Sequence, residues 1–151
     1  LHIFNIALSN KSDLTDLYIP DLRNGNSGAQ VGVSVNEDGK RFTPLKIEKV
    51  IRLTIDDLIY NFNFPVPDII KIDVDGHEKE IIEGMEKILK NKIISSFLIE
   101  FNHNDSFVDL KKKFNQIGYD IDTSYDNLPN HSFIRRMKKG NSARNYIFVR
   151  K

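Results

Sequence analysis

Acidic side chains gather at the end of one strongly apolar segment. Residues 69–74 read Ile-Ile-Lys-Ile-Asp-Val and lead directly into Asp75, Gly76 and Glu78. Two close carboxylates such as Asp73 and Asp75 can raise the pKa of one of them, which makes a general base for deprotonating a hydroxyl. Their oxygens can also hold a divalent cation. Equally, acids at a helix start accept hydrogen bonds from free backbone amides, so the residues alone leave catalytic and structural roles open.

A further acid, Glu100, ends the apolar run Phe97-Leu98-Ile99. Ligands of open α/β sheets bind outside the carboxyl ends of the strands, so two neighbouring strands would present their acids to one crevice. Capping of the following segment would explain Glu100 as well. His103 is the histidine best placed for proton transfer, since the unperturbed pKa of histidine is about 6.5, although a solvated loop residue is its simpler interpretation.

Strand and helix patterns alternate around these acids. We expect strands over residues 2–8, 46–53, 69–74, 96–101 and 146–150, and helices after Thr54, over 77–90 and over 106–116. The central strand is nearly continuous in apolar residues apart from Lys71 and Asp73, which is typical of a parallel strand covered on both sides. The sequence therefore predicts an α/β domain with a mostly parallel sheet whose last strand is antiparallel. Residues 10–45, rich in Asn, Asp, Gly and Ser, are predicted to be a loop and β-hairpin insertion.

The amino-acid composition and net charge exclude several classes of protein. A chain of 151 residues fits one domain, and its 40% hydrophobic and 28% charged residues are typical of a globular protein. With 22 basic and 21 acidic side chains the net charge is +1, which favours neither nucleic acid nor an anionic membrane. No apolar run approaches the roughly 20 residues of a membrane span, so we expect a soluble, cytoplasmic protein. Without cysteine, and without closely spaced histidines, no zinc site is predicted.

Several segments, in order, resemble the FkbM family of S-adenosylmethionine-dependent methyltransferases. Residues 70–78 resemble the family pattern Ile-Lys-(Ile/Leu)-Asp-Val-Glu-Gly-x-Glu, with Asp75 where Glu is usual and His77 where a small residue is usual. The other matching segments are Asn5-Ile6-Ala7-Leu8-Ser9, Leu53-Thr54-Ile55-Asp56-Asp57-Leu58, Phe97-Leu98-Ile99-Glu100 and Asn145-Tyr146-Ile147-Phe148-Val149. Together they cover nearly the whole chain.

The resemblance implies a class I, Rossmann-like domain over residues 1–151. It implies transfer of a methyl group from S-adenosylmethionine to a hydroxyl of a sugar, glycan or polyketide-like acceptor. Asp73 would position or deprotonate that hydroxyl. The implied catalytic set is Asp73, Asp75, Glu78 and Glu100, the implied cofactor contacts are Ala7, Leu8 and Ser9, and no metal is implied.

One expected feature of such methyltransferases is missing from the sequence. A glycine-rich turn normally follows their first strand, and the chain contains no Gly-x-Gly; its clustered Gly25, Gly28 and Gly32 suit a loop. We therefore expect residue 1 to lie near the third strand of the full domain and the segment to be inactive by itself. A non-catalytic remnant or interaction module, and another carboxylate- or metal-dependent α/β enzyme, remain alternatives. The basic run from Arg135 to Lys139 is predicted to be a solvated loop or a contact for an anionic acceptor.

Overall fold

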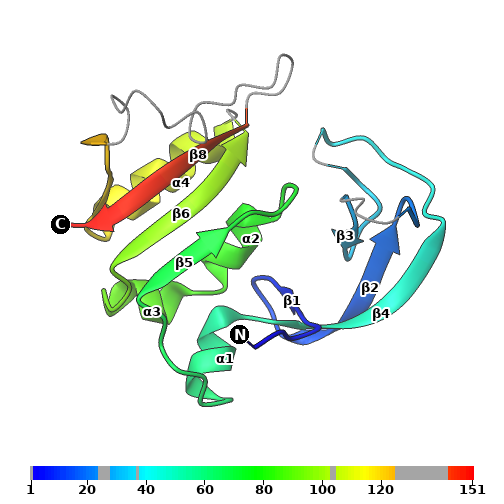
Figure 1. Cartoon of the computed structure of the whole chain (residues 1–151), viewed down its shortest axis with the longest axis horizontal. Coiled ribbons are helices and arrows are strands. Elements are labelled where there is room, and N and C mark those ends of the chain that lie inside the picture. Colours follow the sequence, from blue (N-terminus) through cyan, green and yellow to red (C-terminus); the bar gives the residue numbers. More distant parts are fainter. Residues whose placement is uncertain (1, 24–27, 37, 103–104, 125–142) are drawn as a thin grey trace. The chain divides into compact units, whose positions relative to one another are not determined.

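The computed structural model describes residues 2–23, 28–36, 38–102, 105–124 and 143–151. The chain divides into two compact units, each of which is described by itself (Figure 1). The first unit comprises Leu1–Phe64 and Asp75–Met85, and the second comprises Pro65–Val74 and Glu86–Lys151. Each unit contains a four-stranded sheet. No helix in the described part of the chain is long and apolar enough to cross a membrane.

The sheet of the first unit has the strand order β1-β4-β2-β3. Its strands are β1 (Ala7–Leu8), β2 (Asp13–Ile19), β3 (Gln30–Val31) and β4 (Lys46–Leu53). β1 pairs parallel with β4, whereas β2 is antiparallel to both β4 and β3. The bounds of β4 confirm the strand predicted from its polar and apolar alternation. β1 is shorter than the strand expected over residues 2–8, of which only its last two residues pair.

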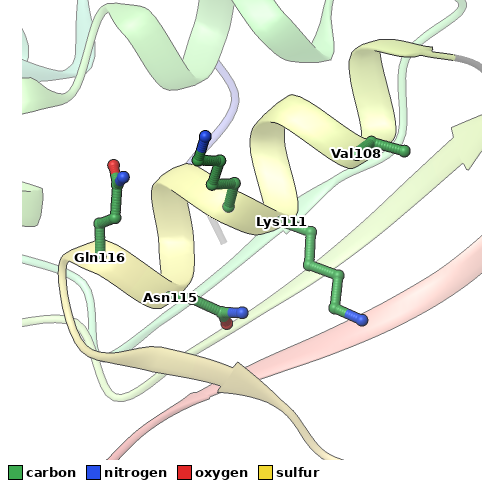
Figure 2. A pocket seen from close by; sticks show the side chains of 5 residues that line it. Val108, Lys111, Asn115 and Gln116 are labelled. Atoms are coloured by element: carbon green, nitrogen blue, oxygen red, sulfur yellow. The ribbon is translucent and has the colours of Figure 1, made fainter.

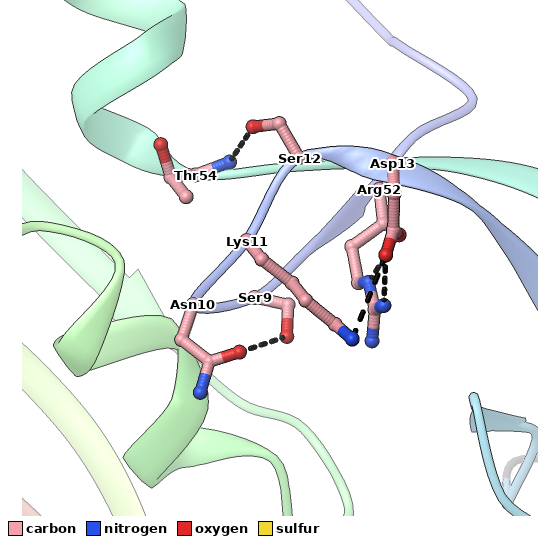
Figure 3. A network of polar contacts seen from close by, with 7 residues as sticks. All are labelled: Ser9, Asn10, Lys11, Ser12, Asp13, Arg52 and Thr54. Atoms are coloured by element: carbon pink, nitrogen blue, oxygen red, sulfur yellow. Dashed lines mark hydrogen bonds and ion pairs between the residues drawn. The ribbon is translucent and has the colours of Figure 1, made fainter.

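A partly buried ion pair fixes the register of β2 on β4. Arg52 and Asp13 lie opposite each other, and the Arg52 Nε and Nη2 atoms donate to the two carboxylate oxygens of Asp13 at 2.8 and 2.7 Å (Figure 3). The Arg52 side chain is only 11% exposed. Hydrogen bonding to Arg52 holds the pKa of Asp13 below its ordinary value. Because the planar guanidinium matches both oxygens at once, a shifted register would leave its buried charge unpaired.

Two short helices belong to the first unit: α1 (Ile55–Tyr60) and α2 (Glu78–Glu83). Thr54 caps α1, since its hydroxyl accepts a hydrogen bond from the Asp57 backbone N–H at 2.9 Å, which confirms the predicted cap. The Thr54 backbone N–H in turn donates to the Ser12 hydroxyl at 3.1 Å (Figure 3). The helix start is thus tied to the segment that leads into β2.

The helix predicted over residues 77–90 is interrupted at Gly84. α2 ends there, and a separate helix, α3 (Glu86–Lys90), follows in the second unit. The Gly84 carbonyl accepts from the Asp56 N–H at 3.0 Å, and a Cβ added to Gly84 would lie 2.0 Å from the Ser9 carbonyl oxygen. The prediction of one continuous helix was wrong, because the helix is interrupted at Gly84, where the chain makes these tertiary contacts.

The sheet of the second unit has the order β5-β6-β8-β7, with β5 (Ile69–Ile72), β6 (Ser96–Asn102), β7 (Tyr119–Ile121) and β8 (Ala143–Arg150). β5 and β6 are parallel, and β8 is antiparallel to β6 and β7. Helix α4 (Asp105–Gln116) packs on this sheet through an aromatic cluster of Phe97, Phe114, Tyr119 and Phe148. The buried Tyr119 hydroxyl donates to the Ile94 carbonyl at 2.6 Å.

The sheets differ from the predicted single, mostly parallel one. Among the described pairings, β1 with β4 and β5 with β6 are parallel, and the others are antiparallel. The α/β class and the antiparallel last strand are as predicted. β5 is not covered on both faces as expected, because Ile69 is 66% exposed. Residues 10–45 supply β2 and β3, and β2 pairs with β4 along its whole length.

We expect Gly84→Ala to destabilise the protein by about 1–3 kcal/mol, because the new methyl group would overlap a backbone oxygen that cannot rotate away. The backbone of Gly84 has φ −76°, which alanine adopts freely, so packing alone decides the outcome. Chemical denaturation measures the free energy of unfolding. The control is Lys79→Ala in the exposed part of α2, which should change it by less than about 0.5 kcal/mol. Equal stability of the two variants would show that Gly84 does not touch Ser9.

Candidate functional site

The acidic motif is divided between the two units. β5 and Asp73 belong to the second unit, whereas Asp75, Gly76 and Glu78 belong to the first. Ala7, Leu8 and Ser9 are also in the first unit, and Glu100 is in the second. The structure therefore forms two groups of predicted site residues, which are described in turn.

In the second unit, Asp73 follows directly after β5 and lies beside the end of β6. The register pairs Ile72 with Ile99, so Asp73 and Glu100 follow neighbouring positions on two parallel strands. The Glu100 side chain lies within hydrogen-bonding reach of Asp73 and helps to lower the pKa of Asp73. The sequence predicted this meeting of two acids at one sheet edge.

Lys71 lowers the pKa of Asp73. The Lys71 Nζ atom donates to Asp73 Oδ2 at 2.5 Å, and both side chains are about half exposed, at 54% and 47%. This hydrogen bond is the main reason that the pKa of Asp73 is lowered; partial burial opposes it, and the bond to Glu100 adds to it. Asp73 is therefore ionised at neutral pH and accepts hydrogen bonds.

In the first unit, the turn from Asp75 to Glu78 is held at both ends. Gly76 has φ +96°, a left-handed conformation that other residues rarely adopt. The Gly76 N–H donates to Glu78 Oε1 at 3.2 Å, and the Asp75 carbonyl accepts from Gln30 Nε2 at 2.9 Å. His77 occupies the cap position of α2 without a side-chain cap bond. Gly76 thus permits a tight turn, and Glu78 and Gln30 secure it.

Glu78 has the opposite electrostatic environment to Asp73. Burial is the main cause that raises the pKa of Glu78, and the negative charges of Asp75 and Glu80 raise it further, against two backbone hydrogen bonds. In lysozyme, for example, two carboxyl groups have different catalytic roles because their environments differ. Glu78 therefore holds its proton more tightly than an ordinary glutamate does.

The predicted cofactor contacts lie at the end of β1. Ala7 and Leu8 are half-buried, and their strand pairs with the carboxyl end of β4. Ser9 is only 4% exposed, with its N–H donating to the Leu53 carbonyl at 3.0 Å and its hydroxyl directed to Asn10 Oδ1 at 3.5 Å (Figure 3). Ser9 is thus fixed by the protein itself, whereas Ala7 and Leu8 are half-buried apolar residues at the end of the first unit's parallel pair of strands.

Two residues of these groups were not singled out as site residues from the sequence. Lys71 has a local signal, since residues two apart on a strand share a face and Lys71 precedes Asp73 by two. Gln30 has no such local signal, because it lies in a polar segment 45 residues before its partner Asp75. His103 and the basic run from Arg135 to Lys139 lie outside the described residues.

Two other kinds of site, a metal cluster and a surface hollow, can be compared with these groups in the described part of the chain. Within the described ranges, no three His, Asp or Glu side chains are grouped as possible ligands of a metal ion. A surface hollow on α4 is lined by exposed side chains of that helix alone (Figure 2). Its lining residues are Val108, Lys111, Lys112, Asn115 and Gln116, and no predicted site residue is among them.

We expect Glu78→Gln to raise the unfolding midpoint at pH 7. A carboxyl group whose pKa is raised by folding destabilises the folded state as the pH rises from its unfolded pKa, about 4.3, through its folded pKa. The glutamine amide keeps an oxygen for the Gly76 N–H but carries no charge, so the gain should vanish below about pH 4. Thermal unfolding at several pH values measures this. Glu48→Gln, in an exposed position, should give no gain, and a Glu78 variant that is less stable at pH 7 would contradict the assigned environment.

Comparison with known proteins bears directly on these groups. No curated protein and no solved structure matches the chain. The sequence model of one family, the Methyltransferase FkbM domain, matches residues 1–146 and so includes the acidic motif, both strand ends and the segment of Ala7 to Ser9. The chain therefore belongs to the FkbM methyltransferase family.

Proposed function

We propose that the protein is an O-methyltransferase that transfers a methyl group from S-adenosylmethionine to a hydroxyl of a sugar, glycan or polyketide-like acceptor. The observation that carries this proposal is the family match over residues 1–146. The match supports methyltransferase activity in general. The donor and the acceptor class belong to the proposal.

The reaction needs little covalent chemistry from the protein. When bound, S-adenosylmethionine would supply a methyl group already activated on a sulfonium sulfur, so that the acceptor oxygen could bond to the methyl carbon in line while the carbon–sulfur bond breaks and the neutral thioether leaves. The residues of the chain must therefore hold the acceptor hydroxyl in line and receive its proton.

We assign the holding of the acceptor hydroxyl to Asp73. Its lowered pKa keeps the carboxylate ionised, so it can accept a hydrogen bond from a hydroxyl. The same low pKa makes Asp73 a weak base, which favours positioning over proton removal. Lys71 and Glu100 then act on Asp73, since both hydrogen-bond its side chain.

Glu78 is better suited than Asp73 to receive a proton. Burial raises its pKa, and a carboxylate with a higher pKa is the stronger base. Asp75 contributes negative charge to Glu78 and provides the backbone carbonyl that anchors the turn. In this proposal Glu78 and Asp75 form an acidic group of the first unit.

The fit to the cofactor is partial. Ala7 and Leu8 are half-buried and apolar at the end of a parallel strand, which suits the flat adenine ring. They would hold that ring, whereas the buried Ser9 hydroxyl is already directed to Asn10. We propose that residues 1–151 belong to one class I, Rossmann-like domain.

Calorimetric titration tests the donor. We expect the full-length protein to bind S-adenosylmethionine with one-to-one stoichiometry and the segment of residues 1–151 not to bind it, because the segment has no glycine-rich turn. ATP serves as the control, since it carries adenosine without the methionine part. Absence of binding to either form would refute the methyltransferase proposal and favour a non-catalytic module on the same scaffold.

Asp73→Asn tests the catalytic assignment. We expect kcat for methyl transfer to fall about 10²-fold or more, because the amide is uncharged and its nitrogen cannot accept a hydrogen bond. The Kd for S-adenosylmethionine should change less than about twofold. Radioactive methyl transfer and calorimetry in the full-length protein measure both quantities.

The matched control is Asp68→Asn, the same chemical change at an exposed position before β5. It should leave kcat unchanged. Unchanged methyl transfer in Asp73→Asn would refute the role of Asp73, and equal losses in both variants would indicate a folding defect rather than a catalytic one.

A further inference from the structure

Gln30 is a buried polar residue whose side chain reaches the acidic motif. It is only 3% exposed, and its Nε2 atom donates to the Asp75 carbonyl at 2.9 Å. Burying an uncompensated amide costs free energy, so a glutamine kept inside a protein needs a partner. Here the partner is the backbone of the residue that opens the turn into α2.

Gln30 is itself attached to the sheet of the first unit. It lies opposite Tyr18 in the pairing of β3 with β2, and the Gly32 N–H donates to the Asp16 carbonyl at 2.8 Å. β2 is in turn fixed on β4 by the Arg52 and Asp13 pair. The amide that reaches Asp75 therefore extends from a strand that pairs with β2 and is hydrogen-bonded to it at Gly32.

The turn needs such an anchor because its own bonds are few. Asp75 and Gly76 are exposed, Gly76 is left-handed, and the bond of its N–H to Glu78 is long, at 3.2 Å. Without Gln30, the Asp75 carbonyl would depend on water. A shift of about 1 Å in a catalytic group can cost roughly 10²-fold in rate, so the placement of Asp75 and Glu78 has direct consequences for catalysis.

We propose that Gln30 is a positioning residue of the methyl-transfer site, which holds the Asp75–Glu78 turn in place through the Asp75 carbonyl. This rests on the proposed function, because it assigns Gln30 an effect on the acceptor side of that reaction. Loss of the bond should lower kcat and leave the KM for S-adenosylmethionine unchanged.

Two variants separate the hydrogen bond from packing. Gln30→Met keeps the length of the side chain and removes the donor, and Gln30→Glu replaces the donor with a carboxylate that repels the carbonyl. Gln116→Met and Gln116→Glu make the same changes at an exposed position on α4 and serve as controls. All four are made in the full-length protein.

Hydrogen exchange followed by mass spectrometry tests the anchor without any need for activity. We expect peptides that cover residues 73–80 to exchange at least about fivefold faster in Gln30→Met, and faster still in Gln30→Glu, with peptides of β6 and α4 unchanged. Unchanged exchange in residues 73–80 would overturn the proposal whatever the activity shows.

Kinetics then tests the effect on catalysis. We expect kcat to fall about tenfold in Gln30→Met and further in Gln30→Glu, while the KM for S-adenosylmethionine changes less than about twofold and the Gln116 controls match the wild type. Faster exchange with an unchanged kcat would overturn the positioning role. A wild-type protein that shows no methyl transfer would refute the proposed function instead, while faster exchange in the variants would still show that Gln30 anchors the turn.

Discussion

The close backbone approach of Gly84 to Ser9 holds the first unit together. This unit is built from two stretches of chain separated in the sequence by residues 65–74, which belong to the second unit. Three contacts join the stretches at this point: the Gly84 approach, the bond of the Asp56 N–H to the Gly84 carbonyl, and the bond of Asn10 Nδ2 to Glu83 Oε2 at 3.0 Å. Helices of six residues, such as α1 and α2, are not stable alone in water, so these contacts decide whether they form.

This arrangement also explains how a short helix can carry site residues. The carboxyl end of α2 is fixed at Gly84 and Glu83, and the turn before its first residue is fixed by Gln30. Glu78 therefore lies between two anchored ends rather than on a loop. Groups that act in catalysis need placement within about 0.5 Å, which side chains on supported elements achieve more readily than side chains on free loops.

Local patterns predicted the elements whose formation depends on nearby residues. The Thr54 cap, the alternation of β4 and the strand that contains Glu100 are all encoded within a few positions, and the parallel pairing of β5 with β6 brought Asp73 and Glu100 together as expected. The break at Gly84, the pairing of β2 along β4 and the bond from Gln30 to Asp75 were not predicted. Each depends on a partner tens of residues away, and no periodicity in the sequence reports which distant backbone atom a side chain will meet.

The same limit applies to the roles of the acids. Asp73, Asp75, Glu78 and Glu100 are chemically similar carboxylates, and their positions after two strands, together with the family resemblance, assigned them to one acidic site. The structure distinguishes them by environment: Lys71 lowers the pKa of Asp73, and burial raises that of Glu78. A carboxylate that stays ionised suits the binding of a hydroxyl, and one that holds a proton more tightly suits its removal. The differences that matter for chemistry therefore come from an ammonium group and from buried surface rather than from the acidic motif itself.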